Sequence, residues 1–285
     1  IVGGNIIGVE FATFLAELGV RVTLIEMMER LLPGEEREAA ALLTQELRNM
    51  GVVVHTGVRM QAIREADSRV ELVASPETGV SGAPPDGAGG RPLEWSAEYA
   101  LICTGRRPRL NAEELDRLGV RYDRRGIAVD AGQQTNVAGL FAVGDVTGGM
   151  MLAHRAMQQG KILADRLCGR GGMDLREETI PSVIYTHPQI ARVGWTEEEA
   201  RRRGISVEVR RADFGANITA RTGLLGNGFV KLLFDGERLA GATVAGEQAG
   251  ELVAPLSLAM AAGLDRRQLD AWVIPHPTLS EVLAL

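Results

Sequence analysis

Cysteine, aromatic residues and long apolar runs are all scarce in this sequence of 285 residues. Its two cysteines, Cys103 and Cys168, lie far apart, which excludes zinc-ribbon and CxxC motifs and is typical of a reducing, cytoplasmic setting. No stretch reaches the length of about 20 apolar residues that spans a bilayer, so we expect no membrane segment. A basic stretch followed by an apolar one is also missing, so we expect no secretory signal.

Positively charged residues are outnumbered by acidic ones, 31 to 37. The formal net charge of −6 argues against a general nucleic-acid binder, and with 4% aromatic residues no stacking platform for single strands is evident. Of the four histidines, His55 lies in a strand-like run and His187 precedes a proline. Neither has a second ligand at useful spacing, so we expect both to be structural and predict no metal site.

The length is enough for two domains or one large one. The chain begins Ile1-Val2-Gly3-Gly4, without an initiator methionine and already in strand-like sequence. We therefore expect it to be a piece of a longer polypeptide.

The first 26 residues predict a strand, a glycine-rich turn, a helix and a second strand. The expected helix carries apolar residues at helical spacing and ends before Gly19, namely Ile7, Phe11, Leu15 and Leu18. A helix at 35–50 and strands from 51 and at 99–104 continue the alternation, which indicates a parallel sheet with crossover helices. Residues 74–92 are rich in Gly and Pro and predict a hairpin loop.

The turn itself matches G-x-G-x-x-G at its first and third glycines, Gly3 and Gly8, with Asn5 at the second. Such a turn seats a pyrophosphate on the helix N-terminus, although alone it could be a plain tight turn. We expect Asn5 to adopt a left-handed backbone and to crowd the phosphate. Glu26 ends the second strand, where an acid accepts hydrogen bonds from the ribose of NAD and repels the 2′-phosphate of NADP. The alternative for Glu26 is a solvated strand end.

Beyond residue 108 the pattern changes twice. Residues 109–178 predict a helical stretch, an extended segment at 139–144 and a long helix at 151–168. The final third predicts antiparallel strands followed by two helices, an α+β arrangement, with strands at 183–185, 207–210, 228–234 and 240–244 and helices at 247–263 and 278–284.

Two polar positions could carry chemistry in these parts. Asp145 follows an apolar strand, where a short acid can hold a sugar or ribitol hydroxyl or simply cap a turn. His276 lies just before the last predicted helix, five residues before Glu281. Glu281 either orients the imidazole for proton transfer or closes a capping box with Thr278, and the spacing favours neither.

Together, several segments of the chain resemble the pyridine nucleotide–disulfide oxidoreductases, and within that family the dihydrolipoyl dehydrogenases. They are GGNIIGVEFA, CTGRRP, TNVAGLFAVGD, MLAH, IPSVIYTHPQIARVGWTEEEA, GFVKLLFD and HPTLSE, with Glu26 at its family position. The resemblance covers essentially the whole chain in family order. It implies electron transfer from a dithiol such as dihydrolipoamide, through a cysteine pair and FAD, to NAD+.

The same resemblance implies a fold and three domains. A Rossmann-type α/β NAD domain would occupy 1–108, the second half of an FAD domain 109–178, and an α+β homodimerisation domain 179–285. The implied NAD(H) contacts are Gly3, Gly4, Asn5, Ile6, Ile7, Gly8, Val9, Glu10, Glu26, Met60 and Gly105, of which Met60 matches only by its place after the third strand. The implied FAD contacts are Asp145, Met151, Leu152, Ala153 and His154. His276, held by Glu281, would be the acid–base residue and would serve the partner subunit's active site.

The sequence departs from the family in three ways. Asn5 replaces the middle glycine, and Gln189 stands where a glutamate is common. The N-terminal FAD domain with its CxxxxC redox disulfide lies outside these 285 residues, and Cys103 and Cys168 cannot replace that pair. We therefore expect the chain alone to be inactive. Two alternatives are a glutathione- or mercuric-reductase type, of which Glu26 disfavours the NADPH-using members, and a non-catalytic truncated protein that binds nucleotide or dimerises.

Overall fold

The computed structural model describes residues 1–77, 92–171 and 174–284. The chain divides into two compact units, residues 1–105 with 181–285, and residues 106–180. The expected mixed α/β fold is confirmed. The first and last thirds of the chain pack into one unit, whereas the predicted domain boundaries fall after 108 and 178. Within the described residues, no helix is long and apolar enough to cross a membrane.

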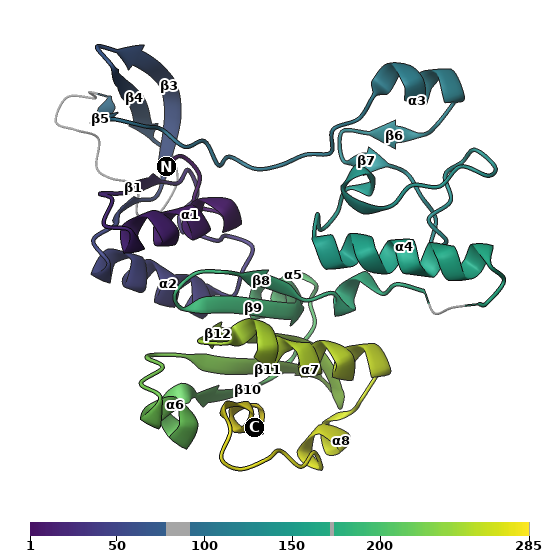
Figure 1. Cartoon of the computed structure of the whole chain (residues 1–285). Helices are drawn as coiled ribbons and strands as arrows, with labels where there is room; N and C mark the ends of the chain where they lie inside the picture. Colours follow the sequence, from purple (N-terminus) through teal and green to yellow (C-terminus); the bar gives the residue numbers. More distant parts are fainter. Residues whose placement is uncertain (78–91, 172–173, 285) are drawn as a thin grey trace. The chain divides into compact units, whose positions relative to one another are not determined.

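A small parallel sheet opens the larger unit (Figure 1). Strand β1 (Thr23–Ile25) pairs in parallel with β2 (Val53–His55), and Val2 bridges in parallel to both Ile25 and Ile102. The predicted strand at 99–104 is reduced to this bridge. Helices α1 (Ile6–Glu17) and α2 (Arg37–Asn49) are the crossovers, so the predicted turn, helix and second strand are confirmed, whereas the first predicted strand is reduced to the bridge at Val2.

The buried face of α1 differs from the predicted one. Val9 and Ala12 are fully buried, whereas Phe11 and Leu18 are 43% and 65% exposed. Apolar residues surround this helix, so spacing alone cannot select its core face. The glycine turn selects it instead, because Gly8 must approach the strand.

An antiparallel meander follows β2, made of β3 (Val58–Ala66), β4 (Arg69–Pro76) and β5 (Leu93–Ala97). The predicted loop at 74–92 begins later than expected, because Ala74 to Pro76 still pair with β3. Residues 78–91 of that loop lie outside the described residues.

The smaller unit holds α3 (Ala112–Leu118), a two-stranded ribbon and α4 (Ala153–Leu167). The ribbon joins β6 (Tyr122–Asp123) to β7 (Gly126–Ile127). The predicted strand at 139–144 is only one bridge, between Gln134 and Phe141, because the 3₁₀ turn η1 (Gly144–Thr147) begins at its end. A second 3₁₀ turn, η2 (Glu177–Thr179), follows α4.

Residues 181–285 complete the larger unit with a five-stranded antiparallel sheet in the order β10-β11-β12-β9-β8. Its strands are β8 (Ser182–Ile184), β9 (Gln189–Gly194), β10 (Glu208–Asp213), β11 (Phe229–Asp235) and β12 (Arg238–Gly246). The helices here are α5 (Glu197–Arg202), α6 (Ile218–Thr222), α7 (Ala249–Ala262) and α8 (Arg266–Asp270), with 3₁₀ turns η3 (Phe214–Ala216) and η4 (Leu279–Leu283).

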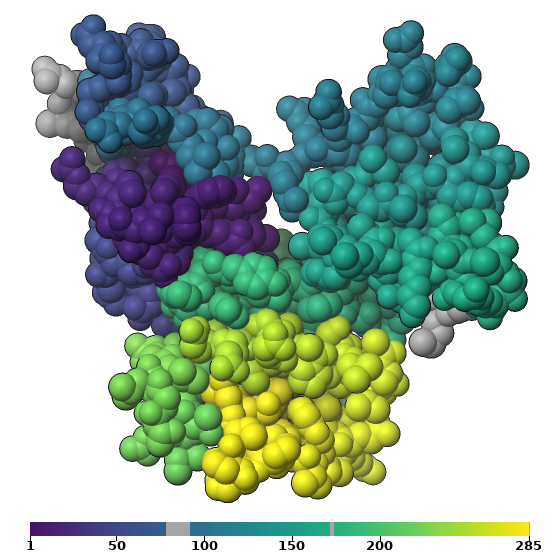
Figure 2. Space-filling view, viewed as in Figure 1, coloured from purple at the N-terminus to yellow at the C-terminus, as the bar shows by residue number. Residues whose placement is uncertain are grey.

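The sequence analysis missed β9, α5, α6 and α8 in this part of the chain. The helix predicted at 278–284 is the 3₁₀ turn η4. The turn η4 lies in the part of the chain drawn in yellow (Figure 2), and it buries Leu279, Val282 and Leu283.

Candidate functional site

The glycines of the first turn are required by its own packing. Gly3 has a φ of +105°, and a side chain there would overlap Cys103 O. A Cβ on Gly8 would overlap Gly3 O, and one on Gly4 would overlap the Leu31 side chain. The backbone therefore comes as close to its neighbours as only glycine allows, which is the geometry that brings a helix N-terminus to a pyrophosphate.

Asn5 does not use the left-handed backbone that we expected for it. Its φ of −89° and ψ of −172° are extended, because Asn5 is the N-cap of α1. Its Oδ1 accepts a hydrogen bond of 2.9 Å from the Ile6 N–H. A phosphate seated on this helix end would compete with Asn5 for that N–H.

Glu26 is buried, so its interpretation as a solvated strand end is wrong. Only 8% of the residue is exposed. Its Oε2 accepts from Gly4 N–H at 2.6 Å, and its Oε1 accepts from Met28 N–H at 2.7 Å. An ionised carboxylate has about four acceptor sites, so about two remain beyond these two backbone bonds. The carboxylate thus ties the glycine turn to the end of β1.

The other predicted NAD contacts lie in different surroundings. Val9 is fully buried, and its N–H donates to Asn5 O, so it supports the turn from within the core. Glu10 Oε1 accepts from Tyr185 N–H at 2.9 Å. Met60 lies in β3 and is half-buried. It packs beside Ile25, the residue that directly precedes Glu26 in the sequence. Gly105, the last residue of this segment, has a φ of +119°.

Asp145 lies in the smaller unit, at the start of η1. It is exposed, and within the described residues no hydrogen bond engages its carboxylate. Met151 O accepts from Arg106 Nη2 at 3.0 Å, Leu152 is the N-cap of α4, and Ala153 and His154 begin that helix. A free carboxylate and the amides of a 15-residue helix fit the sugar-like and carbonyl groups of a flavin nucleotide.

His276 and Glu281 are in contact, which is one of the two arrangements that the sequence left open. His276 Nδ1 lies 2.8 Å from Glu281 Oε1, while Glu281 Oε2 accepts from Thr278 N–H at 2.9 Å. The Thr278 N–H and then the imidazole hold the pKa of Glu281 below its ordinary value. The two alternatives for Glu281 are therefore both satisfied at once, one by each carboxylate oxygen. The imidazole is 71% exposed, so its second nitrogen can meet a reactant.

Comparison with known proteins places these features in one family. The pyridine nucleotide-disulphide oxidoreductase family matches residues 1–160, and the dimerisation domain of the same family matches residues 180–285. The chain belongs to this family. It is 37% identical to the dihydrolipoyl dehydrogenase of Thermus scotoductus over 99% of the chain and 59% of that protein. It is 35% identical to the enzyme of Bacillus subtilis over the same shares.

Solved structures of the family agree with the fold. The structure titled LpdA from Mycobacterium tuberculosis superposes with a TM-score of 0.87 at 25% identity, over 99% of this chain and 59% of that one. The HOCl-induced flavoprotein disulfide reductase RclA from Escherichia coli gives 0.84 at 28% identity, over 99% and 62%. The chain thus spans about three fifths of the length of the relatives it matches.

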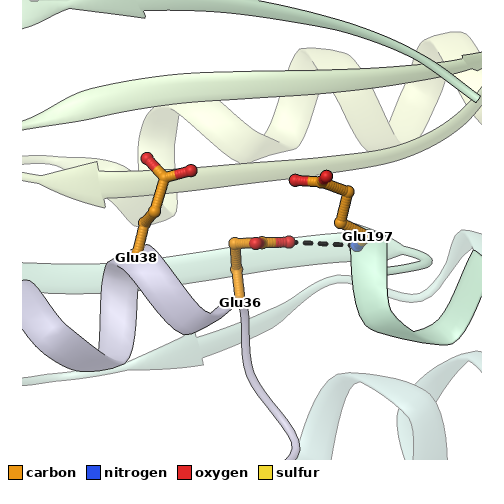
Figure 3. A group of neighbouring side chains, drawn as sticks. All are labelled: Glu36, Glu38 and Glu197. Atoms are coloured by element: carbon orange, nitrogen blue, oxygen red, sulfur yellow. Dashed lines mark hydrogen bonds between the residues drawn. The ribbon is translucent and has the colours of Figure 1, made fainter. Parts of the chain in front are cut away.

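A buried lysine that the sequence analysis missed joins the first and the last segments of the larger unit. Lys231, on β11, is 2% exposed. Its Nζ lies 3.2 Å from Glu36 Oε1 and 3.0 Å from Glu197 Oε2, and it also bonds to Glu38. The three carboxylates converge from the start of α2 and the start of α5 (Figure 3). Although such a trio could hold a metal ion, the ammonium group fills that role here.

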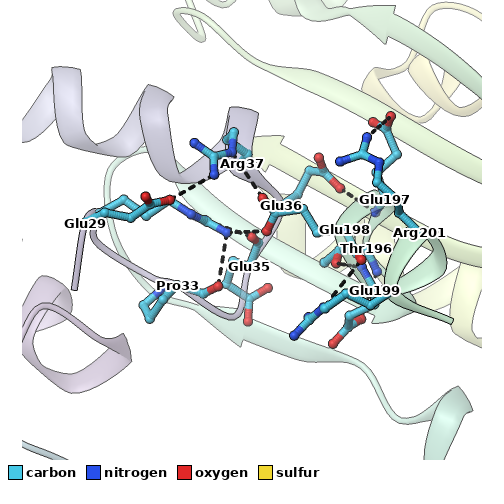
Figure 4. A network of polar contacts seen from close by, with 12 residues as sticks. Glu29, Pro33, Glu35, Glu36, Arg37, Thr196, Glu197, Glu198, Glu199 and Arg201 are labelled. Atoms are coloured by element: carbon cyan, nitrogen blue, oxygen red, sulfur yellow. Dashed lines mark hydrogen bonds and ion pairs between the residues drawn. The ribbon is translucent and has the colours of Figure 1, made fainter. Parts of the chain in front are cut away.

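Further ion pairs surround this lysine cluster (Figure 4). Glu198 pairs with Arg30 at 2.6 Å and with Arg37 at 3.1 Å, and Arg192 Nε donates to Glu35 at 2.8 Å. Each pair joins residues before position 40 to residues after position 190. The ion pairs therefore add to the apolar packing between the two segments, in which Ile184, Ile190, Phe229 and Ala245 share one buried cluster with residues of α1 and α2.

The remaining polar positions have structural partners. His55 packs edge-on against Trp95 with 5.3 Å between ring centroids, and His187 Nδ1 pairs with Glu17 at 2.5 Å. Gln189, a family departure, accepts from Gly250 N–H at 3.3 Å through its Oε1. It thereby caps α7, whose own N-cap residue makes no side-chain bond. A glutamate at 189 would add a favourable charge at this helix end.

Proposed function

We propose that this chain is the nucleotide-binding and dimerising part of an NAD-linked flavoprotein disulfide oxidoreductase of the dihydrolipoyl dehydrogenase type. The reaction is dihydrolipoamide + NAD+ → lipoamide + NADH + H+. The observation that carries the proposal is the His276–Glu281 contact of 2.8 Å, with an exposed imidazole on a short, capped turn. The names of the relatives at 35–37% identity support the dithiol substrate.

His276 would act as the base toward the substrate dithiol. A thiol is a weak nucleophile until it loses its proton, and an unperturbed thiol is mostly protonated at neutral pH. Imidazole is suited to take that proton, since it titrates near neutrality. Glu281 would fix the tautomer, with Nδ1 as donor, and would stabilise the imidazolium. In a homodimer formed through residues 180–285, His276 would serve the partner subunit's disulfide.

Glu26 would make the protein specific for NAD(H). Its carboxylate is already fixed by two backbone N–H groups, so it cannot swing away from a 2′-phosphate. Gly3 to Glu10 would hold the pyrophosphate, and Asn5 would weaken that grip through its bond to the Ile6 N–H.

Asp145 and the N-terminus of α4 would hold FAD, which when bound would carry electrons from the reduced redox cysteines to NAD+. The absence of a protein partner for the Asp145 carboxylate, within the described residues, fits this role. The first FAD domain and the redox cysteines of the family would come from sequence outside these 285 residues. We accordingly infer that the chain alone neither holds FAD stably nor oxidises dihydrolipoamide, and that the whole protein works in the cytoplasm.

Replacing His276 by Gln in the complete protein tests the proposal. Positioned general bases contribute about 10²–10⁴-fold, so dihydrolipoamide-linked turnover should fall by that factor. FAD content and the reduction of artificial acceptors by NADH should survive, because hydride transfer to flavin does not use this proton. If both activities fall equally, or if neither falls, His276 is not the base toward the dithiol and is only the residue before η4.

A second candidate is a disulfide reductase that runs in the opposite direction, from a reduced nicotinamide to a disulfide. The likeness to the flavoprotein disulfide reductase from Escherichia coli favours it. The two candidates differ in their preferred substrate, and both need His276.

A further inference from the structure

Two buried polar side chains of α4 hold the turn that carries Asp145. Gln159 is 1% exposed, and its Oε1 accepts from Gly144 N–H at 2.8 Å. Arg155 is 7% exposed, and its Nη1 donates to Gly148 O at 3.1 Å and to the Thr147 hydroxyl at 3.3 Å. The two residues lie four positions apart and so share one face of the helix. That face thus holds the backbone on both sides of Asp145.

The burial of Arg155 shows that this arrangement is built for these contacts. A buried guanidinium is destabilising unless its donors are paired. Its Nε lies 2.9 Å from both oxygens of Glu177, and Nη1 is engaged by the turn. A helix face made only for packing would carry apolar residues here, as Ile162 does one turn further on.

The ribbon closes the turn from a third side. A Cβ on Gly126 of β7 would lie 2.6 Å from Thr147 C, and a Cβ on Gly148 would overlap Arg125 O. Gly144 has a φ of +78°, which it keeps with its N–H held by Gln159. The turn therefore has little room to move, and its one outward-facing charged group is Asp145.

We propose that Arg155 and Gln159 are positioning residues for FAD, which fix this turn so that the Asp145 carboxylate meets a ribitol hydroxyl. The inference rests on the proposed function, which supplies FAD as the ligand of Asp145. A carboxylate on a fixed backbone loses less conformational freedom on binding than one on a mobile loop. It therefore binds its ligand, here FAD, more tightly.

Titration of FAD into the flavin-free complete protein, followed by flavin fluorescence, tests the proposal. Gln159→Leu leaves the buried Gly144 N–H without an acceptor, so FAD should bind about tenfold more weakly or worse. Arg155→Met, which releases Gly148 O, should act in the same direction. Gln159→Glu keeps an acceptor oxygen for the Gly144 N–H and should bind FAD as tightly as the unmutated protein does. Gln158→Leu makes the same chemical change at the exposed neighbouring position and should have no effect.

A double-mutant cycle with Asp145→Ala shows whether the effect passes through Asp145. If it does, Gln159→Leu should weaken FAD binding little further in the Asp145→Ala background. Fully additive losses would overturn the proposal, as would a lower melting temperature of the flavin-free Gln159→Leu protein with unchanged FAD affinity. If the unmutated protein takes up no FAD, the proposed function fails. Normal uptake with no effect of Gln159→Leu overturns only the positioning role.

Discussion

Replacing Lys231 by Met should destabilise the larger unit more than any surface substitution. The methionine keeps most of the lysine's apolar stem but removes the ammonium group from among three carboxylates. Removing one partner of a buried ion pair costs about 3–5 kcal/mol. We expect about 3 kcal/mol, the lower end, because Glu36 is 3% exposed whereas Glu38 and Glu197 are 47% and 34% exposed and screened by water.

The three tryptophans of the chain, Trp95, Trp195 and Trp272, all lie in the unit that contains Lys231. Urea unfolding followed by tryptophan fluorescence therefore reports on this unit. With a urea m-value of about 3 kcal/mol/M, a loss of about 3 kcal/mol lowers the unfolding midpoint by about 1 M. Lys161, the other lysine of the sequence, is exposed on α4. Lys161→Met should leave the midpoint unchanged.

As the pH falls, the stability of the unmutated protein and that of Lys231→Met should change in opposite directions. Burial alone would raise the pKa of Glu38, but Lys231 and Arg211 lower it below its ordinary 4.5. Its contribution to the unmutated protein is therefore present above about pH 4.5 and is lost as the pH falls through the lowered pKa. In Lys231→Met, protonation of the carboxylates instead relieves their mutual repulsion. The difference in unfolding midpoint between the two proteins should therefore narrow from pH 7 to pH 5. A gap that stays constant, or a midpoint shift near zero at pH 7, would refute this account of the cluster.

Three further outcomes follow from single positions. Gln133 is buried, and its Oε1 has no hydrogen-bond partner within the described residues. Gln133→Leu should therefore stabilise residues 106–180 by about 1–3 kcal/mol, as measured by slower hydrogen exchange of that segment. Unchanged or faster exchange would contradict this prediction. NADH should bind the chain at least tenfold more tightly than NADPH by calorimetric titration, since Glu26 would face the 2′-phosphate; equal affinities would disprove the role of Glu26. Gly8→Ala should abolish NADH binding, because its Cβ would overlap Gly3 O, whereas Gly34→Ala, at a position with open space and no positive φ, should still bind NADH.

Local patterns predicted most of the elements in residues 1–55. The glycine turn, Glu26 and the helix at 35–50 lie close together in sequence, and their spacing carries the geometry. The face of α1 did not follow from spacing, because apolar residues surround that helix and the turn decides which of them is buried. Strand β9 was missed because Arg192 interrupts its apolar pattern, although that arginine pairs with Glu35 from the other end of the chain.

The site was predictable where its residues are close in sequence and hidden where they are not. His276 and Glu281 lie five positions apart, so their contact was one of two arrangements that the sequence offered. Asn5 was misjudged, because the N-cap role and the left-handed turn both suit asparagine and only the backbone distinguishes them. Lys231 and its carboxylates lie far apart in sequence, and Arg155 and Gln159 are polar residues on a buried helix face, where sequence patterns predict solvent.

The most direct test of the central claim is nicotinamide reduction by the complete protein with two dithiol systems side by side. We predict that dihydrolipoamide with NAD+ gives NADH, and that this activity falls sharply in His276→Gln. Glutathione with NADP+, and glutathione disulfide with NADPH, should give little turnover. Absence of NADH formation from dihydrolipoamide, or faster NADPH-linked reduction of glutathione disulfide, would contradict the assignment to an NAD-linked dihydrolipoamide oxidoreductase.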